Sequence, residues 1–217
     1  MRLGFQQRLS DLKERLLVMA GVAEQAIHRS VEAYRVRDMS ICDLVDDGEH
    51  AIQRFEREID QMALDLLAME HPVANDLRFT LAVIRINADL KRAGKAARSI
   101  SRRVRDLQTL PVVDLPADIP RMALLATTMA RNALLAFVDA DAVLAQSVLS
   151  TDDTVDRLND GAQLALSSLM ERQPELVPQA LNTMMIAHSL ERIAHHSKKV
   201  AADVIFWVRG GGLRQHV

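Results

Sequence analysis

The chain repeats itself at a separation of about 100 residues. Matching residues lie 103 positions apart in four pairs: Asp38 and Asp141, Glu49 and Asp152, Gln53 and Asp156, and Arg54 and Arg157. Further along, the separation shortens to 100, which pairs Leu90-Lys91-Arg92 with Leu190-Glu191-Arg192 and Gly94 with Ala194. A period of this size indicates one helical unit written twice, with a small deletion in the second copy. The two copies can therefore be compared position by position.

The composition favours helices over strands. Apolar residues make up 49% of the chain and aromatic residues only 3%, and glycine and proline are few. The net charge of −2 gives no general attraction to nucleic acid. The single cysteine, Cys42, cannot form an internal disulfide, which fits a reducing compartment. We expect a soluble, cytoplasmic protein, because the first residues lack the apolar run of a signal peptide and no stretch approaches the ~18 uncharged apolar residues of a membrane span.

Apolar residues step by three and four along several segments, which is the pattern of a buried helical seam. The clearest seam is Ile86, Leu90, Ala93, Ala97, Ile100, Val104 and Leu107. Pro72 marks a turn, and three prolines within 108–120 indicate a linker. The expected helices cover 5–36, 38–69, a third ending at 107, 120–139, 141–171, and a sixth ending near 209, before Gly210-Gly211-Gly212.

These segments predict an all-α fold, a tandem repeat of two antiparallel three-helix bundles. The first bundle is expected to span residues 1–107, the linker 108–120 and the second bundle 121–210, with a flexible tail at 211–217.

Candidate metal ligands gather in the second copy. Glu191 and His195 lie four residues apart, so both side chains emerge on one helical face, and Asp152 and Asp156 have the same spacing on the preceding helix. Helical bundles hold metal ions with such pairs on neighbouring helices. Carboxylates with one imidazole suit Fe, Mn or Zn. His188 could reach the same patch.

A plainer interpretation stays open. In the seam of the last helix, Glu191 and His195 fall at outer heptad positions, where acids are commonly solvated. On this view Asp152 and Asp156 are ordinary surface acids, and His195 and His196 are two solvated surface histidines.

The first copy carries cations where the second carries ligands. Lys91 and Lys95 correspond to Glu191 and His195, and ammonium groups cannot ligate a metal. They belong to a basic stripe that steps by four and three: Lys91, Lys95, Arg98, Arg102 and Arg105. The stripe has three interpretations: a solvated face with lysines paired to Glu49 or Glu56, ammonium groups that replace a lost metal charge, or a docking surface for an acidic partner. Nucleic acid is the weaker candidate, because aromatic residues for stacking are few.

Three motifs in this chain resemble the PhoU family, the phosphate-uptake regulators of bacteria and archaea. The segment 67–78 is similar to the family's "LLA-x-x-x-PVA-x-DLR" turn, and 190–196 is similar to "LERIGDHA". The segment 152–156 matches "D-x-x-[IV]-D". The resemblance covers essentially the whole chain, including its duplication.

The resemblance implies two three-helix bundles and a regulator that is not an enzyme. It implies negative control of the phosphate-starvation response, as an adaptor between the phosphate ABC transporter ATPase subunit and a sensor histidine kinase. It also implies a homodimer that associates with membrane complexes only peripherally. Some family members bind metals through E(D)-x-x-x-D pairs in each repeat. Here one site is expected, in the second repeat only, formed by Asp152, Asp156, Glu191 and His195.

Two other functions compete with the adaptor. A metal-dependent carboxylate-bundle enzyme would need ligands inside the bundle and a substrate cavity, whereas the candidates lie at outer positions. A helical scaffold without a signalling role is the third possibility.

Overall fold

The computed structural model describes residues 2–69 and 74–210, and within them it contains helices and no strands. The helices are α1 (Arg2–Val36), α2 (Met39–Met69), α3 (Ala74–Leu107), α4 (Ile119–Asp139), α5 (Ala142–Leu149), α6 (Asp152–Arg172), the short 3₁₀ helix η1 (Pro174–Leu176) and α7 (Val177–Arg209). The all-α prediction is confirmed. The turn expected at Pro72 and the tail 211–217 lie outside the described residues.

The turn between α1 and α2 recurs between α4 and α5. Arg37 and Ala140, 103 residues apart, both have left-handed backbone conformations, with φ of 57° and 52°. The next residue caps the following helix in each case: Asp38 Oδ1 accepts the Ser40 amide at 2.8 Å, and Asp141 Oδ1 accepts the Val143 amide at 2.8 Å. The period seen in the sequence is therefore also a period of backbone geometry.

The helix expected over 141–171 is divided into α5 and α6. The break falls at Ser150 and Thr151, whose hydroxyl groups both donate to the Ser147 carbonyl, at 2.9 and 3.0 Å. Local side-chain bonds of this kind compete with the helical backbone pattern. Because of the break, Asp152 is the first residue of α6.

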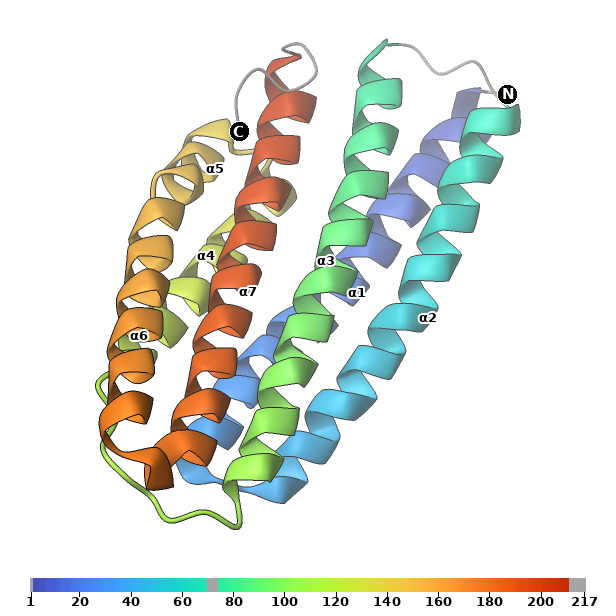
Figure 1. Cartoon of the computed structure of the whole chain (residues 1–217). Coiled ribbons are helices and arrows are strands. Elements are labelled where there is room, and N and C mark those ends of the chain that lie inside the picture. The colour runs from blue at the N-terminus through green and yellow to red at the C-terminus, as the bar shows by residue number, and fades with distance from the viewer. Residues whose placement is uncertain (1, 70–73, 211–217) are drawn as a thin grey trace.

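The two repeats share one core. Figure 1 shows α3 and α7 side by side in the middle of the molecule, with α1 and α2 beside α3 and with α4, α5 and α6 beside α7. One continuous cluster of buried apolar side chains runs through both repeats. Aromatic rings join them at one place: the Trp207 ring lies 5.1 Å from Phe79 of the first repeat and 5.5 Å from Phe137 of the second, centroid to centroid.

Polar groups also cross between α3 and α7. His196 Nδ1 lies 3.1 Å from Asp89 Oδ1, and Arg85 Nη1 lies 3.3 Å from Asp203 Oδ1. His196 is only 7% exposed, so its interpretation as a solvated surface histidine is wrong. The reason is that α7 is buried on two faces, one toward its own repeat and one toward α3.

α4 is the one described helix that is long and apolar enough to cross a membrane, by length and composition alone. Half of its most apolar window is buried against the rest of the protein. Its Met122, Ala126, Met129 and Ala133 side chains are at most 2% exposed. This burial is typical of a core helix.

The aromatic contact gives a stability prediction. Phe137→Ala should lower the free energy of unfolding by about 3–5 kcal/mol, because removing the Phe137 ring, which is 1% exposed, leaves a cavity in the core. Chemical denaturation would measure it. Leu164→Ala, at a site 76% exposed, is the matched control and should change stability little. Equal losses in the two variants would contradict the assignment of Phe137 to the shared core.

Candidate metal centre

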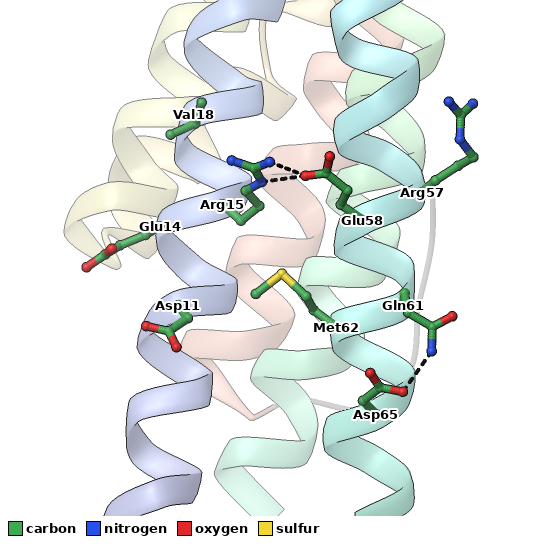
Figure 2. A pocket seen from close by; sticks show the side chains of 9 residues that line it. All are labelled: Asp11, Glu14, Arg15, Val18, Arg57, Glu58, Gln61, Met62 and Asp65. Carbon is green, nitrogen blue, oxygen red and sulfur yellow. Dashed lines mark hydrogen bonds and ion pairs between the residues drawn. The ribbon is translucent and has the colours of Figure 1, made fainter.

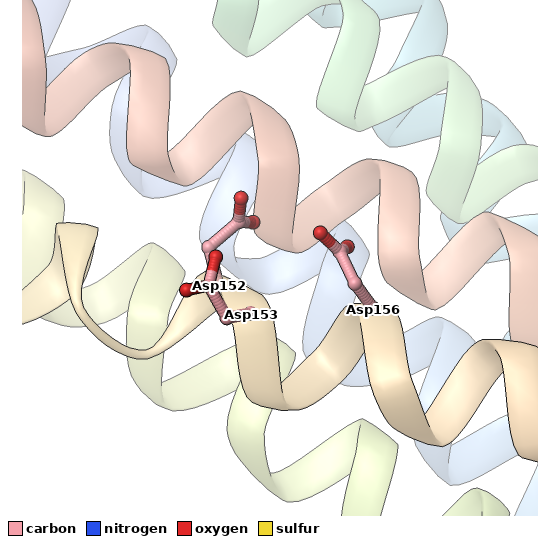
Figure 3. A group of neighbouring side chains, drawn as sticks. All are labelled: Asp152, Asp153 and Asp156. Atoms are coloured by element: carbon pink, nitrogen blue, oxygen red, sulfur yellow. The ribbon is translucent and has the colours of Figure 1, made fainter. Parts of the chain in front are cut away.

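Three aspartates converge at the start of α6. One oxygen from each of Asp152, Asp153 and Asp156 lies within 4.8 Å of the others. Asp152 and Asp156 extend from α6 toward α7, whereas Asp153 is exposed (Figure 3). Asp152 is only 1% exposed, so it does not occupy the solvated position expected for a surface acid. Asp153 was absent from the predicted ligand set, although it adjoins Asp152 in the first turn of the helix.

Glu191 and His195 of α7 belong to the same electrostatic cluster. Burial raises the pKa of Glu191, and the charges of Asp156 and Asp152 raise it further, while His188 and His195 lower it. Burial likewise raises the pKa of Asp156, and Asp152 adds to the rise. His188 Nδ1 lies 3.2 Å from Glu191 Oε2, so this histidine contacts the cluster through Glu191. Glu191 and His195 are therefore close enough to influence the α6 acids electrostatically, whereas the ligand atoms that lie within 4.8 Å of one another come from Asp152, Asp153 and Asp156 alone among the described residues.

A lysine that the sequence analysis missed lies inside the cluster. Lys198 Nζ is 2.9 Å from Asp152 Oδ2. The first repeat has the equivalent ion pair, because Arg98 Nη1 is 3.1 Å from Glu49 Oε2. Arg98 and Lys198 are 100 residues apart, so comparing the copies in sequence could have identified this pair. Each repeat therefore neutralises the first acid of its motif with a cation from its last helix.

The donor set fits a metal ion in the second repeat. Asp152 Oδ1 is buried and has no hydrogen-bond partner among the described residues. A buried carboxylate oxygen without a partner is costly, and a cation between it and Asp156 would satisfy it. Burial is the main cause of the raised pKa values of Asp156 and Glu191, and the neighbouring carboxylates add to it.

The first repeat is arranged differently at the same place. Both oxygens of Glu49, which is 1% exposed, have partners within the protein: Gln53 Nε2 donates to Oε1 at 2.5 Å, and Arg98 contacts Oε2. Lys91 Nζ is 2.6 Å from Glu56 Oε1. In the first repeat, an amide group and basic side chains thus neutralise or hydrogen-bond Glu49 and Glu56, so these acids need no metal ion as a partner.

The basic stripe lies along the acids of α2. Besides Lys91, two more of its members form ion pairs: Arg98 with Asp46 at 3.1 Å, and Arg105 with Asp43 at 2.7 Å. Lys95 and Arg102 are exposed and have no ion pair among the described residues. Three of the five stripe residues are therefore neutralised by the protein itself.

A wide, open groove lies on the other side of the first repeat, between α1 and α2 (Figure 2). Arg15 Nε donates to Glu58 Oε2 at 2.7 Å across it, and Gln61 Nε2 donates to Asp65 Oδ1 at 2.7 Å along α2. Arg15 also lies over the Phe55 ring, 4.6 Å from its centroid. None of Asp152, Asp153, Asp156 and Glu191 lines this groove, so it is not a substrate cavity for those acids.

Comparison with known proteins matches both halves of the chain. The family described as "PhoU domain" matches residues 16–104 and again 119–204. The phosphate-specific transport system accessory protein PhoU homolog of Pseudomonas aeruginosa is 32% identical over 97% of this chain and 87% of its own length. The homolog of Aquifex aeolicus is 28% identical over 86% and 84%.

Solved structures give the same result. The crystal structure of PhoU from Pseudomonas aeruginosa superposes with a TM-score of 0.93 at 32% identity, over 95% of this chain and all of that one. PhoU from Streptococcus pneumoniae shares the fold with a TM-score of 0.83 at 20% identity, over 97% of this chain.

The raised pKa values predict how stability depends on pH. Folded Asp156 and Glu191 hold protons more tightly than their ordinary pKa values of 3.8 and 4.5 allow, so the folded state binds more protons than the unfolded state. Stability of the metal-free protein should then fall as pH rises from those ordinary values through the raised ones, and the loss should persist above them.

Asp156→Asn should weaken this pH dependence. In chelator at neutral pH it should melt above the parent protein, and the difference should shrink as pH falls toward 3.8. Thermal melts across a pH series would measure it, with Asp160→Asn, an exposed acid of the same helix, as the control. Parallel melting curves for parent and Asp156→Asn would contradict the assignment.

Proposed function

Because this chain belongs to the PhoU family, we propose that it serves phosphate-specific transport as a PhoU-type accessory protein. The observation that carries the proposal is that the family match covers both repeats and that the named relatives align over nearly the whole chain. We further propose that it acts in the cytoplasm as an adaptor between the phosphate ABC transporter ATPase subunit and a sensor histidine kinase. In that role it would repress phosphate uptake and starvation signalling, without catalysing a reaction, and as a homodimer.

The same proposal includes one metal ion in the second repeat. Asp152, Asp156 and Glu191 would hold it, with His195 as the imidazole ligand and Asp153 beside them. The metal supplies positive charge that balances the clustered carboxylates, and Fe, Mn or Zn suits the donors. The chain's own residues prepare the place: α6 and α7 bring the acids together, and Lys198 neutralises one oxygen of Asp152.

An enzyme of the carboxylate-bundle kind has less support. Asp152 is paired with Lys198, and no nucleophile paired with a base accompanies the cluster in the described part of the chain. The regulatory names of the relatives also favour an accessory role.

Metal binding can be tested with the purified protein. After chelation, adding Mn²⁺ or Zn²⁺ should raise the melting temperature, because a ligand that binds the folded state stabilises it. Asp156→Asn should lose most of that rise. Lys198→Gln should bind the metal more tightly, because it removes the cation that competes for Asp152. Asp160→Asn, an exposed acid of the same helix, is the control and should keep the full rise. The metal site is refuted if neither ion changes the melting temperature of the parent protein.

The regulatory role needs a test in cells. Deleting the gene should de-repress phosphate uptake in phosphate-replete medium, and the transporter ATPase subunit and a histidine kinase should co-purify with the restored, tagged protein. If the exposed part of the basic stripe docks an acidic partner, Lys95→Glu with Arg102→Glu should weaken that co-purification in a salt-dependent way. Arg57→Glu, an exposed α2 arginine, is the control. Normal repression in the deletion strain would contradict the proposed role.

A further inference from the structure

The two ends of the contact between the repeats are filled differently. At one end, the rings of Phe79, Phe137 and Trp207 pack on one another. At the other end, where α1 and α3 end and α4 and α7 begin, lies a partly enclosed pocket of about 210 Å³. α1 and α3 end, and α7 begins, at the lower end of the molecule in Figure 1. The polar side chains that line the pocket are Tyr34, Arg37, Asp114, Gln179 and Thr183.

The repeat makes these two ends equivalent. Four residues that line the pocket match apolar residues of the other end at the offsets of 103 and 100 residues: Tyr34 matches Phe137, Gln179 matches Phe79, Thr183 matches Val83 and Leu107 matches Trp207. An amide and a leucine are smaller than the phenyl and indole rings that they replace, which leaves space at this end. Because the apolar set packs the other end of the same fold, the fold itself does not require polar side chains here.

The amide of Gln179 is the least satisfied polar group of the pocket. Gln179 is 4% exposed, and its Oε1 atom has no hydrogen-bond partner in the part of the chain that the structure describes. Beside it, burial raises the pKa of the Tyr34 hydroxyl, while the charge of Arg37 and a hydrogen bond with Thr183 lower it. These side chains therefore form one polar wall. A polar molecule in the pocket would offset the cost of burying an amide oxygen without a partner.

The charges of the pocket limit what can bind there. Arg37 Nη1 donates to the Leu107 carbonyl at 2.7 Å, which holds the guanidinium group at the wall of the pocket. Neither Arg37 nor Asp114 forms an ion pair with another described residue. An anion would be repelled by Asp114 and a cation by Arg37, whereas a molecule with both charges is attracted by both residues. The volume is below the about 300–1,000 Å³ of pockets for drug-sized ligands, so the molecule is small.

We propose that this pocket binds a free α-amino acid with a short apolar side chain. Arg37 would hold the carboxylate, Asp114 would face the ammonium group, and Val113 and Leu115 would contact the side chain. The bound molecule would connect α1, α7 and the linker, and so hold the two repeats together at this end as the aromatic rings do at the other. It requires neither the metal ion nor the adaptor role proposed above.

Binding can be measured with the purified protein in chelator, by thermal melts and by calorimetry. Each common amino acid is added singly, beside acetate, inorganic phosphate and butylamine, which carry charge of one sign only. Alanine, valine or another amino acid with a short apolar side chain should raise the melting temperature, because a ligand that binds the folded state stabilises it. The three compounds of single charge should bind more weakly. The assignment is overturned if no amino acid binds, or if one of these three binds as tightly as the best amino acid.

Two variants then place that binding in the pocket. Gln179→Phe introduces the residue found at the other end, so it should fill the pocket and abolish the heat of binding, while the protein melts no lower than the parent. Arg37→Met should weaken the affinity roughly tenfold or more, because a charge-assisted hydrogen bond is lost. Arg35→Met, at an exposed arginine one half-turn away, is the control and should bind like the parent. Parent-like affinity in folded Arg37→Met contradicts the pocket, as does undiminished binding by Gln179→Phe.

Discussion

The packing of α3 against α7 is the contact on which the rest of the structure depends. A three-helix bundle can bury the seam of its last helix internally, yet here each last helix also buries a second face against the other repeat. That second face carries the Asp89–His196 pair, whose desolvation is costly and is offset by the further contact of Arg92 with Asp89 at 3.1 Å. Neighbouring residues of α7 consequently serve different partners: His196 faces the first repeat, while His195 and Lys198 face the acids of α6.

Much of this fold was predictable because its determinants are local. Helical periodicity, the aspartate caps at Asp38 and Asp141 and the 103-residue offset all involve residues close in sequence or related by the repeat. The packing between repeats was not predictable in the same way. A heptad assignment assumes one buried face per helix, so it placed His196 in solvent, where the structure buries it. The break between α5 and α6 was not predicted either, because serine and threonine hydroxyls that bond to a preceding carbonyl also occur within unbroken helices.

The candidate site was predicted from the same local patterns, and as a metal centre it stays a prediction. Spacing along two helices predicted that Asp152, Asp156, Glu191 and His195 form one site; in the structure these groups influence one another's pKa values, but the carboxylates that converge are Asp152, Asp153 and Asp156. The pairing of Asp152 with Lys198 depends on tertiary contact and was missed. For the basic stripe of α3, too, the sequence did not show which acids pair with it. Counting its charges in sequence overstates the free positive charge, because acids of α2 step along the helix in register with it and neutralise Lys91, Arg98 and Arg105.

The differences between the repeats follow a common physical logic. Where the first repeat satisfies its buried acid with an amide and a guanidinium, it needs nothing from outside to be stable at that point. The second repeat leaves an oxygen of Asp152 without a partner in the part of the chain that the structure describes, and it places further carboxylates beside that oxygen. The exposed faces of α1 and α4 follow the same division, since Glu32 and Arg35 of α1 satisfy each other while Leu135 and Val138 of α4 remain in water. The buried Asp152 oxygen lowers the stability of the isolated chain, and a bound cation would relieve that cost. Asp152 on α6 and the exposed leucines of α4 both lie on helices that pack against α7, so binding at either place has a direct physical connection to the core that both repeats share.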